Sequence, residues 1–377
     1  MLKRVFVLLF LIFTGFYVFS WEAGLFSSSF INVPAGWYVL ENSEDKVTFA
    51  DPTDTAYFQL KRYPGDRFSS AVEFYSYVSG ELGSVGEGEQ FLFDTKDSYF
   101  SSISFESSGY SYMGYLVCIE GEFEDIVLLA FSDKENYDLS HDFIISAIDS
   151  YSLNESGLKN PGPVSQFYYP FPGRDKTINY LTLDNKKISV SFDINEIDAA
   201  RVLIDREVRV LVQYTNSELS NLAWERYYKL IYRDNYNRLR RVARIITQEI
   251  TEDFESLSPL DKSSMLLAWI QEFEYIRTGT LSDFMSPIDT VFAFAGDCDS
   301  RALLYVILLE YNGIDSILMV SSEYSHSLVG VAVEGFGARY YYEGSGYLIA
   351  ETTDNVSIGL IDQAMADPEK WMGIKFK

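Results

Sequence analysis

One cysteine of the chain stands where a nucleophile would be expected. Cys298 follows Ala295-Gly296-Asp297 and precedes an apolar segment that ends at Asn312-Gly313. Apolar residues recur there at helical spacing, and Asn-Gly is typical of a helix end, so Cys298 should occupy the first turn of a helix. The free N–H groups and the dipole at that end favour negative charge and increase the thiolate fraction of the sulfur. A thiolate is the form of cysteine that attacks a carbonyl carbon.

A base for this nucleophile follows in the next elements of the chain. The segment 316–320 is expected to be a strand, and His326, one of only two histidines, begins a second strand. Strands are also expected at 339–342 and 346–353, because both segments are rich in apolar and aromatic residues. Neighbouring strands of one sheet would bring a polar residue at the end of the last strand beside His326.

The acid that would orient this base is expected at the end of the last strand. Glu351 follows four mostly apolar residues, so its carboxylate would interrupt a buried strand. A buried carboxylate requires a partner, and the imidazole N–H of His326 would serve. Asp354 is the alternative acid. Cys298, His326 and one of these carboxylates would together supply a nucleophile, a general base and the group that orients the base.

The order of these residues resembles the transglutaminase-like superfamily, whose members have a papain-type Cys-His-acid fold. Gly296-Asp297-Cys298 at a helix start is followed by His326 and then by an acid after an aromatic-bearing strand. The bacterial branch is more similar still, because it carries a Pro-x-x-Thr segment before the cysteine and Glu-Thr-Thr at the acid. This chain has Pro287-Ile288-Asp289-Thr290 and Glu351-Thr352-Thr353 at those places. The motifs cover residues 260–360.

The resemblance implies a domain in which the nucleophile helix packs on an antiparallel sheet. It implies that Cys298 attacks an amide carbonyl, that His326 moves the proton, and that Glu351 holds the imidazole. Gln271 matches a family glutamine and could stabilise the oxyanion together with the N–H of Cys298; as an exposed helix residue it would equally have no such role.

The chain departs from the family pattern beside the nucleophile and beside the base. Ser300 and Arg301 differ from the Asp-Lys pair of the bacterial branch, and Ser327-Leu328 replaces the small residue and Trp of many members. The second departure concerns the geometry of the substrate channel rather than the triad.

Residues 167–377 form the expected transglutaminase-like domain, with a helical lead-in at 195–275 and a catalytic core at 259–362. Within the lead-in, amphipathic helices are expected at 195–214 and 221–249. Arginines gather at 233–244, but apolar residues alternate with them. This pattern indicates a helix with one charged face rather than a surface for nucleic acid.

Residues 21–151 form a separate unit with strands flanked by helices, which is typical of an α+β fold. Its opening Val33-Pro34-Ala35-Gly36-Trp37 and its final helix around 146–150 resemble PsbP-like proteins. That resemblance implies an α/β/α sandwich with an antiparallel sheet and a non-catalytic role in interactions. Residues 152–166 are expected to be a linker, because Pro161-Gly162-Pro163 interrupts regular structure.

Composition and the first residues indicate an exported protein that does not bind nucleic acid. The formal net charge of −25 disfavours contacts to phosphate backbones. Residues 1–20 carry Lys3, Arg4 and an apolar run, which is typical of a signal peptide. Without cleavage the run would tether the chain to a membrane. Periplasmic or extracellular localisation follows.

The sequence therefore predicts an exported cysteine enzyme that acts on peptide or protein amide bonds through a thioester. Hydrolysis (a protease or amidase) and transglutaminase-type acyl transfer both remain open. The alternative is a catalytically silent binding protein of the periplasm or cell surface. No cofactor is expected, and the two widely separated histidines, without a cysteine pair, disfavour a metal site.

Overall fold

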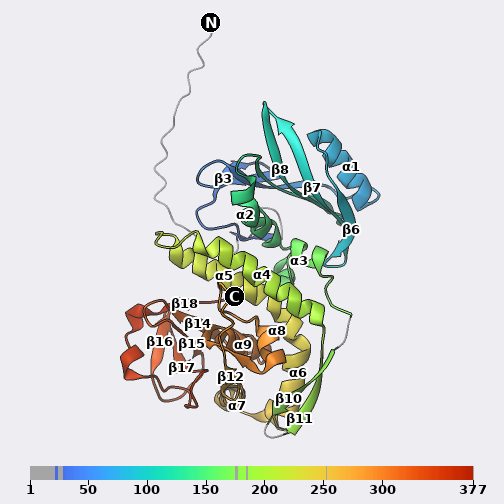
Figure 1. Cartoon of the computed structure of the whole chain (residues 1–377). Coiled ribbons are helices and arrows are strands. Elements are labelled where there is room, and N and C mark those ends of the chain that lie inside the picture. Colours follow the sequence, from blue (N-terminus) through green and yellow to red (C-terminus); the bar gives the residue numbers. More distant parts are fainter. Residues whose placement is uncertain (1–21, 24–28, 175–176, 184–185, 252, 377) are drawn as a thin grey trace.

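The first part of the chain folds into a seven-stranded antiparallel sheet in the order β3-β4-β5-β9-β8-β7-β6 (Figure 1). Its strands are β3 (Tyr38–Asn42), β4 (Lys46–Ala50), β5 (Ala56–Pro64), β6 (Gly88–Phe93), β7 (Lys96–Ser107), β8 (Tyr110–Ile119) and β9 (Glu124–Asp133). A short pair, β1 (Glu22–Ala23) and β2 (Phe30–Ile31), precedes the sheet.

The computed structural model describes residues 22–23, 29–174, 177–183, 186–251 and 253–376. The expected signal peptide, residues 1–20, lies outside the described residues. Within the described ranges, no helix has the length and the apolar character that crossing a bilayer requires.

Two helices cover opposite faces of this sheet. α1 (Ala71–Leu82) packs through Phe74 and Val78 in a cluster that contains Cys118. α2 (Tyr137–Asp149) packs in a second cluster that contains Val117. Because successive side chains of a strand point to opposite faces, the helices enclose the sheet between two apolar layers. Cys118 is thus a buried core residue.

The segment expected to be a linker is folded and packed, so that expectation is wrong. It contains η1 (Glu155–Lys159) and begins α3 (Pro163–Tyr168). Pro163 occupies the first turn of α3, where its missing N–H costs nothing. Ser165 donates through its backbone N–H and its hydroxyl to the buried Asp149 carboxylate, at 2.9 and 2.7 Å. The prolines therefore start a helix here rather than separate two domains.

A helical layer made by α4 (Ile194–Val212) and α5 (Ser220–Tyr236) lies between the first sheet unit and the rest of the chain (Figure 1). The hairpin β10 (Thr177–Leu183) and β11 (Lys186–Phe192) precedes this layer in the chain, and η2 (Asn237–Leu239), α6 (Arg240–Glu249), η3 (Phe254–Ser256), α7 (Pro259–Gln271) and α8 (Pro287–Ala293) follow it. The single helix expected over 221–249 is broken by η2. Apolar spacing continues on both sides of the break, so periodicity alone did not reveal it.

Buried charges join the first sheet unit to this helical layer. Arg206 contacts the carboxylates of Asp149 and Glu207 at 2.7 and 2.8 Å. Arg226 contacts Glu207 at 3.0 Å, and Ser146 donates to the same carboxylate at 2.8 Å. Asp149 and Ser146 belong to α2, whereas the other three belong to α4 and α5. Because paired buried charges are costly to separate, these contacts hold α2 against the helical layer.

The last part of the chain is a five-stranded antiparallel sheet with a buried helix on it. The sheet order is β16-β17-β15-β14-β18. The strands are β14 (Ser316–Ser321), β15 (His326–Val331), β16 (Arg339–Tyr342), β17 (Ser345–Ala350) and β18 (Met372–Ile374), with η4 (Gln363–Met365) and η5 (Pro368–Lys370) before the last. α9 (Cys298–Tyr311) packs on β14 and β15. The parallel pair β12 (Glu274–Tyr275) and β13 (Ala295–Gly296) leads into α9.

Candidate active site

Cys298 is the first residue of α9, as the sequence predicted. The preceding Asp297 is extended and caps the helix, because its carboxylate accepts the N–H of Ser300 at 2.9 Å. Burial and then the nearby charge of Asp299 raise the pKa of Asp297 to about 6. Cys298 is 5% exposed and lines a cavity. The sulfur is therefore sheltered, and the cavity gives access to it.

His326 and Glu351 come together because their strands are neighbours. β15 pairs with β17 in the register that joins Val329 to Ala350. His326 begins β15 and Glu351 directly follows β17, so the two side chains lie at the same end of the pair. Nε2 of His326 lies 2.7 Å from Oε2 of Glu351. The acid that contacts the base is thus Glu351, while Asp354 is exposed in the loop beyond it.

The second oxygen of the Glu351 carboxylate is also occupied. Oε1 accepts the backbone N–H of Thr353 at 2.7 Å and its hydroxyl at 2.6 Å. Burial raises the pKa of Glu351, but the hydrogen bond and charge of His326 and the bonds from Thr353 outweigh it and lower the pKa. The carboxylate is therefore charged and fixed in one orientation.

The imidazole of His326 lies between this carboxylate and the thiol. Its Nε2 contacts Glu351, and the thiol of Cys298 lies close enough to the ring to raise its pKa. Since Nε2 faces the carboxylate, Nδ1 is the nitrogen left for the sulfur. Burial lowers the pKa of His326, but the hydrogen bonds to Cys298 and Glu351 and their charges raise it to about 10. The structure thus brings together Cys298, His326 and Glu351 in an arrangement that favours an imidazolium.

The family resemblance implied that Gln271 could stabilise the oxyanion. Its side chain points elsewhere, so that expectation is wrong. Its amide nitrogen donates to the carbonyls of Glu351 and Val356, at 2.8 and 2.9 Å. Both of its N–H donors are therefore occupied. Gln271 fixes the loop after β17 and in this way helps to hold Glu351 in position.

Arg301, which departs from the family pattern, is a part of the site that the sequence did not predict. Its buried guanidinium donates to the carbonyls of Gly296 at 2.9 Å, Phe273 at 2.6 Å and Thr352 at 3.4 Å. Burial lowers the pKa of Arg301, against the nearby negative charges of the site. This side chain ties the start of α9 to the segment after the acid. An arginine on an otherwise apolar helix was the signal in the sequence.

Asp299 is a second residue that was missed. Its partly buried carboxylate accepts the hydroxyl of Ser327 and lies 3.8 Å from the sulfur of Cys298. Burial raises the pKa of Asp299. Ser327, which follows the base and departs from the family pattern, therefore has a defined partner. The thiol has a carboxylate on one side and an imidazole on the other.

A cavity of about 590 Å³ opens on the sulfur and the imidazole. Its wall carries aromatic residues and charges of both signs, among them Trp224, Tyr228, Arg277, Asp283, Glu369 and Trp371. This size and mixture suit a peptide side chain with its backbone. Within the described ranges, no three His, Cys, Asp or Glu residues are placed to hold a metal ion.

No family model and no curated protein matches the chain. Solved structures that are similar to parts of it include the PsbP protein of Synechocystis sp. PCC 6803 (CyanoP), 11% identical, covering 33% of this chain and 86% of that one with a TM-score of 0.28. LpqN of Mycobacterium tuberculosis, involved in cell envelope biogenesis, is 17% identical and covers 33% of this chain and 82% of its own, with a TM-score of 0.26. A candidate protease of Parabacteroides distasonis ATCC 8503 is 9% identical and covers 81% of this chain and 64% of its own, with a TM-score of 0.22. At these TM-scores the similarities do not establish a family.

Proposed function

We propose that the chain is a cysteine enzyme of the transglutaminase-like type that acts on peptide or protein amide bonds. The observation that carries the proposal is the position of His326, with Glu351 2.7 Å from one ring nitrogen and Cys298 beside the ring in the same cavity wall. An imidazole between a thiol and a carboxylate is the arrangement that nucleophilic catalysis by cysteine requires.

The first half of the proposed reaction forms a thioester. The thiolate of Cys298 attacks the carbonyl carbon of the substrate, and the electron pair of the C=O bond moves to oxygen. The backbone N–H of Cys298 at the start of α9 is available to stabilise that oxyanion. The intermediate collapses as the C–N bond breaks, and the imidazolium of His326 gives its proton to the departing amine. The products are a free amine and an acyl group on Cys298.

The second half releases the acyl group. Water or a primary amine gives a proton to the neutral imidazole of His326 and attacks the thioester carbonyl. Collapse of the second intermediate breaks the S–C bond and restores the thiolate and imidazolium. Water yields a carboxylic acid, as in a protease or amidase, and an amine yields a new amide. Glu351 keeps the ring in one orientation through both halves.

We propose that this activity takes place outside the cytoplasm, because residues 1–20 are expected to be a signal peptide. The first sheet unit, which contacts the helical layer through α2, would serve as an interaction module of the PsbP-like kind.

Mass spectrometry of a peptide mixture incubated with the protein and a primary amine tests the proposal. Cleaved peptides would identify a hydrolase, and peptides that carry the amine would identify an acyltransferase. The Cys298→Ala variant serves as the control and should abolish either product. A wild-type protein that gives neither product over a broad set of peptides would favour the silent binding protein.

Thiol labelling gives a second, substrate-independent test. Iodoacetamide should modify Cys298 much faster than Cys118, because burial strongly raises the pKa of Cys118. The His326→Ala variant should slow labelling of Cys298 and leave Cys118 unchanged. Equal rates for Cys298 in both proteins would contradict the proposed role of the imidazole.

A further inference from the structure

A second cavity lies beside α6 and shares no lining residue with the cavity at Cys298. Its volume is about 370 Å³, which suits a small organic ligand. Four arginines line it, namely Arg238, Arg240, Arg241 and Arg244. This concentration of positive charge is unusual in a chain whose formal net charge is −25. The arginine-rich stretch thus forms one wall of a cavity as well as a charged helical face.

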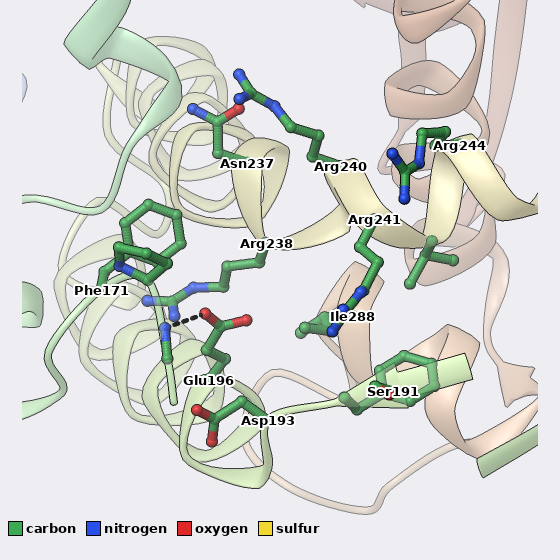
Figure 2. A pocket seen from close by; sticks show the side chains of 14 residues that line it. Phe171, Ser191, Asp193, Glu196, Asn237, Arg238, Arg240, Arg241, Arg244 and Ile288 are labelled. Carbon is green, nitrogen blue, oxygen red and sulfur yellow. Dashed lines mark hydrogen bonds between the residues drawn. The ribbon is translucent and has the colours of Figure 1, made fainter. Parts of the chain in front are cut away.

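Arg238 supplies the buried donor at the base of this cavity. Its Nε and Nη2 donate to the carboxylate of Asp234, at 3.1 and 2.9 Å. Its Nη1 is buried and has no hydrogen-bond partner within the described part of the chain. Figure 2 shows the side chain extending toward Phe171 and Glu196. A buried N–H group without an acceptor is costly, so an acceptor from outside the chain would relieve it.

Arg241 and Arg244 supply charges that the protein leaves unpaired. Both side chains are exposed on the first turns of α6, and neither has an ion pair among the residues that the structure describes. Residues three apart on a helix lie on the same face, so the two guanidinium groups can approach one ligand. Arg240 differs, because it also interacts with Tyr311.

The negative charges of the cavity are already engaged with the backbone. Glu196 accepts the N–H of Gly173 at 2.7 Å, which Figure 2 marks, and Asp193 accepts the N–H of Asn195 at 2.9 Å as the cap of α4. Beside them, the wall has an apolar part made by Phe192, Val242 and Ile288. The cavity therefore combines unpaired cations with a surface for an apolar group.

We propose that this cavity binds an organic phosphate monoester, with the phosphate at Arg238, Arg241 and Arg244 and the organic part against the apolar wall. Two unpaired guanidinium groups match a dianion better than a single carboxylate, and arginine binds phosphate oxygens in pairs. The proposal does not depend on the chemistry at Cys298.

Calorimetric titration with phenyl phosphate tests this site. We expect saturable binding that weakens about tenfold or more in Arg241→Gln, because a paired, charge-assisted contact is lost. Arg241→Lys keeps the charge without the planar fork, so its affinity for phenyl phosphate should lie between those of the wild type and Arg241→Gln. Arg67→Gln removes an exposed arginine that packs on Tyr63 and Tyr77 in the first sheet unit, and it should bind as the wild type does.

Two other ligands test the contributions of the phosphate charge and of the aromatic ring separately. Benzoate carries one charge on the same ring, and inorganic phosphate lacks the ring, so both should bind more weakly than phenyl phosphate. If the wild type sediments with phosphatidic acid vesicles and the Arg241→Gln variant does not, the phosphate is that of a lipid. Absence of saturable binding, equal binding of benzoate, or an equal loss in Arg67→Gln would overturn the proposal.

Discussion

Gln271 donates to the backbone carbonyl of Glu351 at 2.8 Å, so the end of α7 holds the residue that orients the base. The second donor of the same amide reaches Val356 at 2.9 Å. The loop after β17 is thereby fixed at two points. The glutamine acts on the site through the backbone of the acid, which separates its role from that of a group in contact with substrate.

Replacing Gln271 by Ala should slow the labelling of Cys298 by iodoacetamide. Two carbonyls would lose their donor, which costs about 1–3 kcal/mol for each that stays buried, and Glu351 would be held less firmly. Alkylation forms no oxyanion, so an oxyanion donor would not affect the labelling rate. An unchanged rate together with a large fall in peptide turnover would show that Gln271 contacts the reacting carbonyl after all.

Replacing Glu351 by Gln should lower the pKa of His326 from about 10 toward the ordinary 6.5. The carboxylate favours the imidazolium, and an amide of the same shape does not. Proton NMR can measure the pKa of His326 directly, because the chain has only 2 histidines. The signal that disappears in the His141→Asn variant belongs to His141, and the remaining signal belongs to His326. A His326 titration that stays the same in the variant would show that the carboxylate does not set the charge of the ring.

The raised pKa of His326 should also be visible in the pH dependence of stability. The pKa of His326 is raised in the folded state, so its contribution to the free energy of unfolding is complete below about 6.5. That contribution is lost as the pH rises through about 10. Urea unfolding of the wild type and of His326→Asn should therefore converge between those two pH values. A constant difference between the two proteins across that range would contradict the raised pKa.

Replacing Arg301 by Met should destabilise the protein. The guanidinium donates to three backbone carbonyls, and methionine would remove this donor from each of them; only Gly296 would keep another, the N–H of Ile276. The expected loss in the free energy of unfolding is about 1–3 kcal/mol for each carbonyl that remains buried. Arg301→Lys should recover part of the loss, since one ammonium reaches fewer acceptors than a planar fork. Urea unfolding measures both variants, and a stability equal to that of the wild type would show that water replaces the guanidinium.

Short-range patterns in the sequence located the elements of the site. Gly296 and Asp297 before an apolar helical period placed Cys298 at a helix start, because caps and periodicity depend only on nearby residues. The apolar runs near His326 and before Glu351 similarly indicated neighbouring strands, and their pairing in one sheet brings the two side chains to 2.7 Å.

Only the tertiary structure decided the partners of the side chains. Gln271 could have pointed to substrate, and its two carbonyl partners lie 80 and 85 residues away. Arg301 reaches Thr352 across 51 residues, and Asp299 reaches Ser327 across 28. Such contacts depend on how the sheet and helices pack together, a long-range property that local periodicity does not encode. The sequence by itself therefore determined which residues stand at the ends of which elements, and packing determined what each of them contacts.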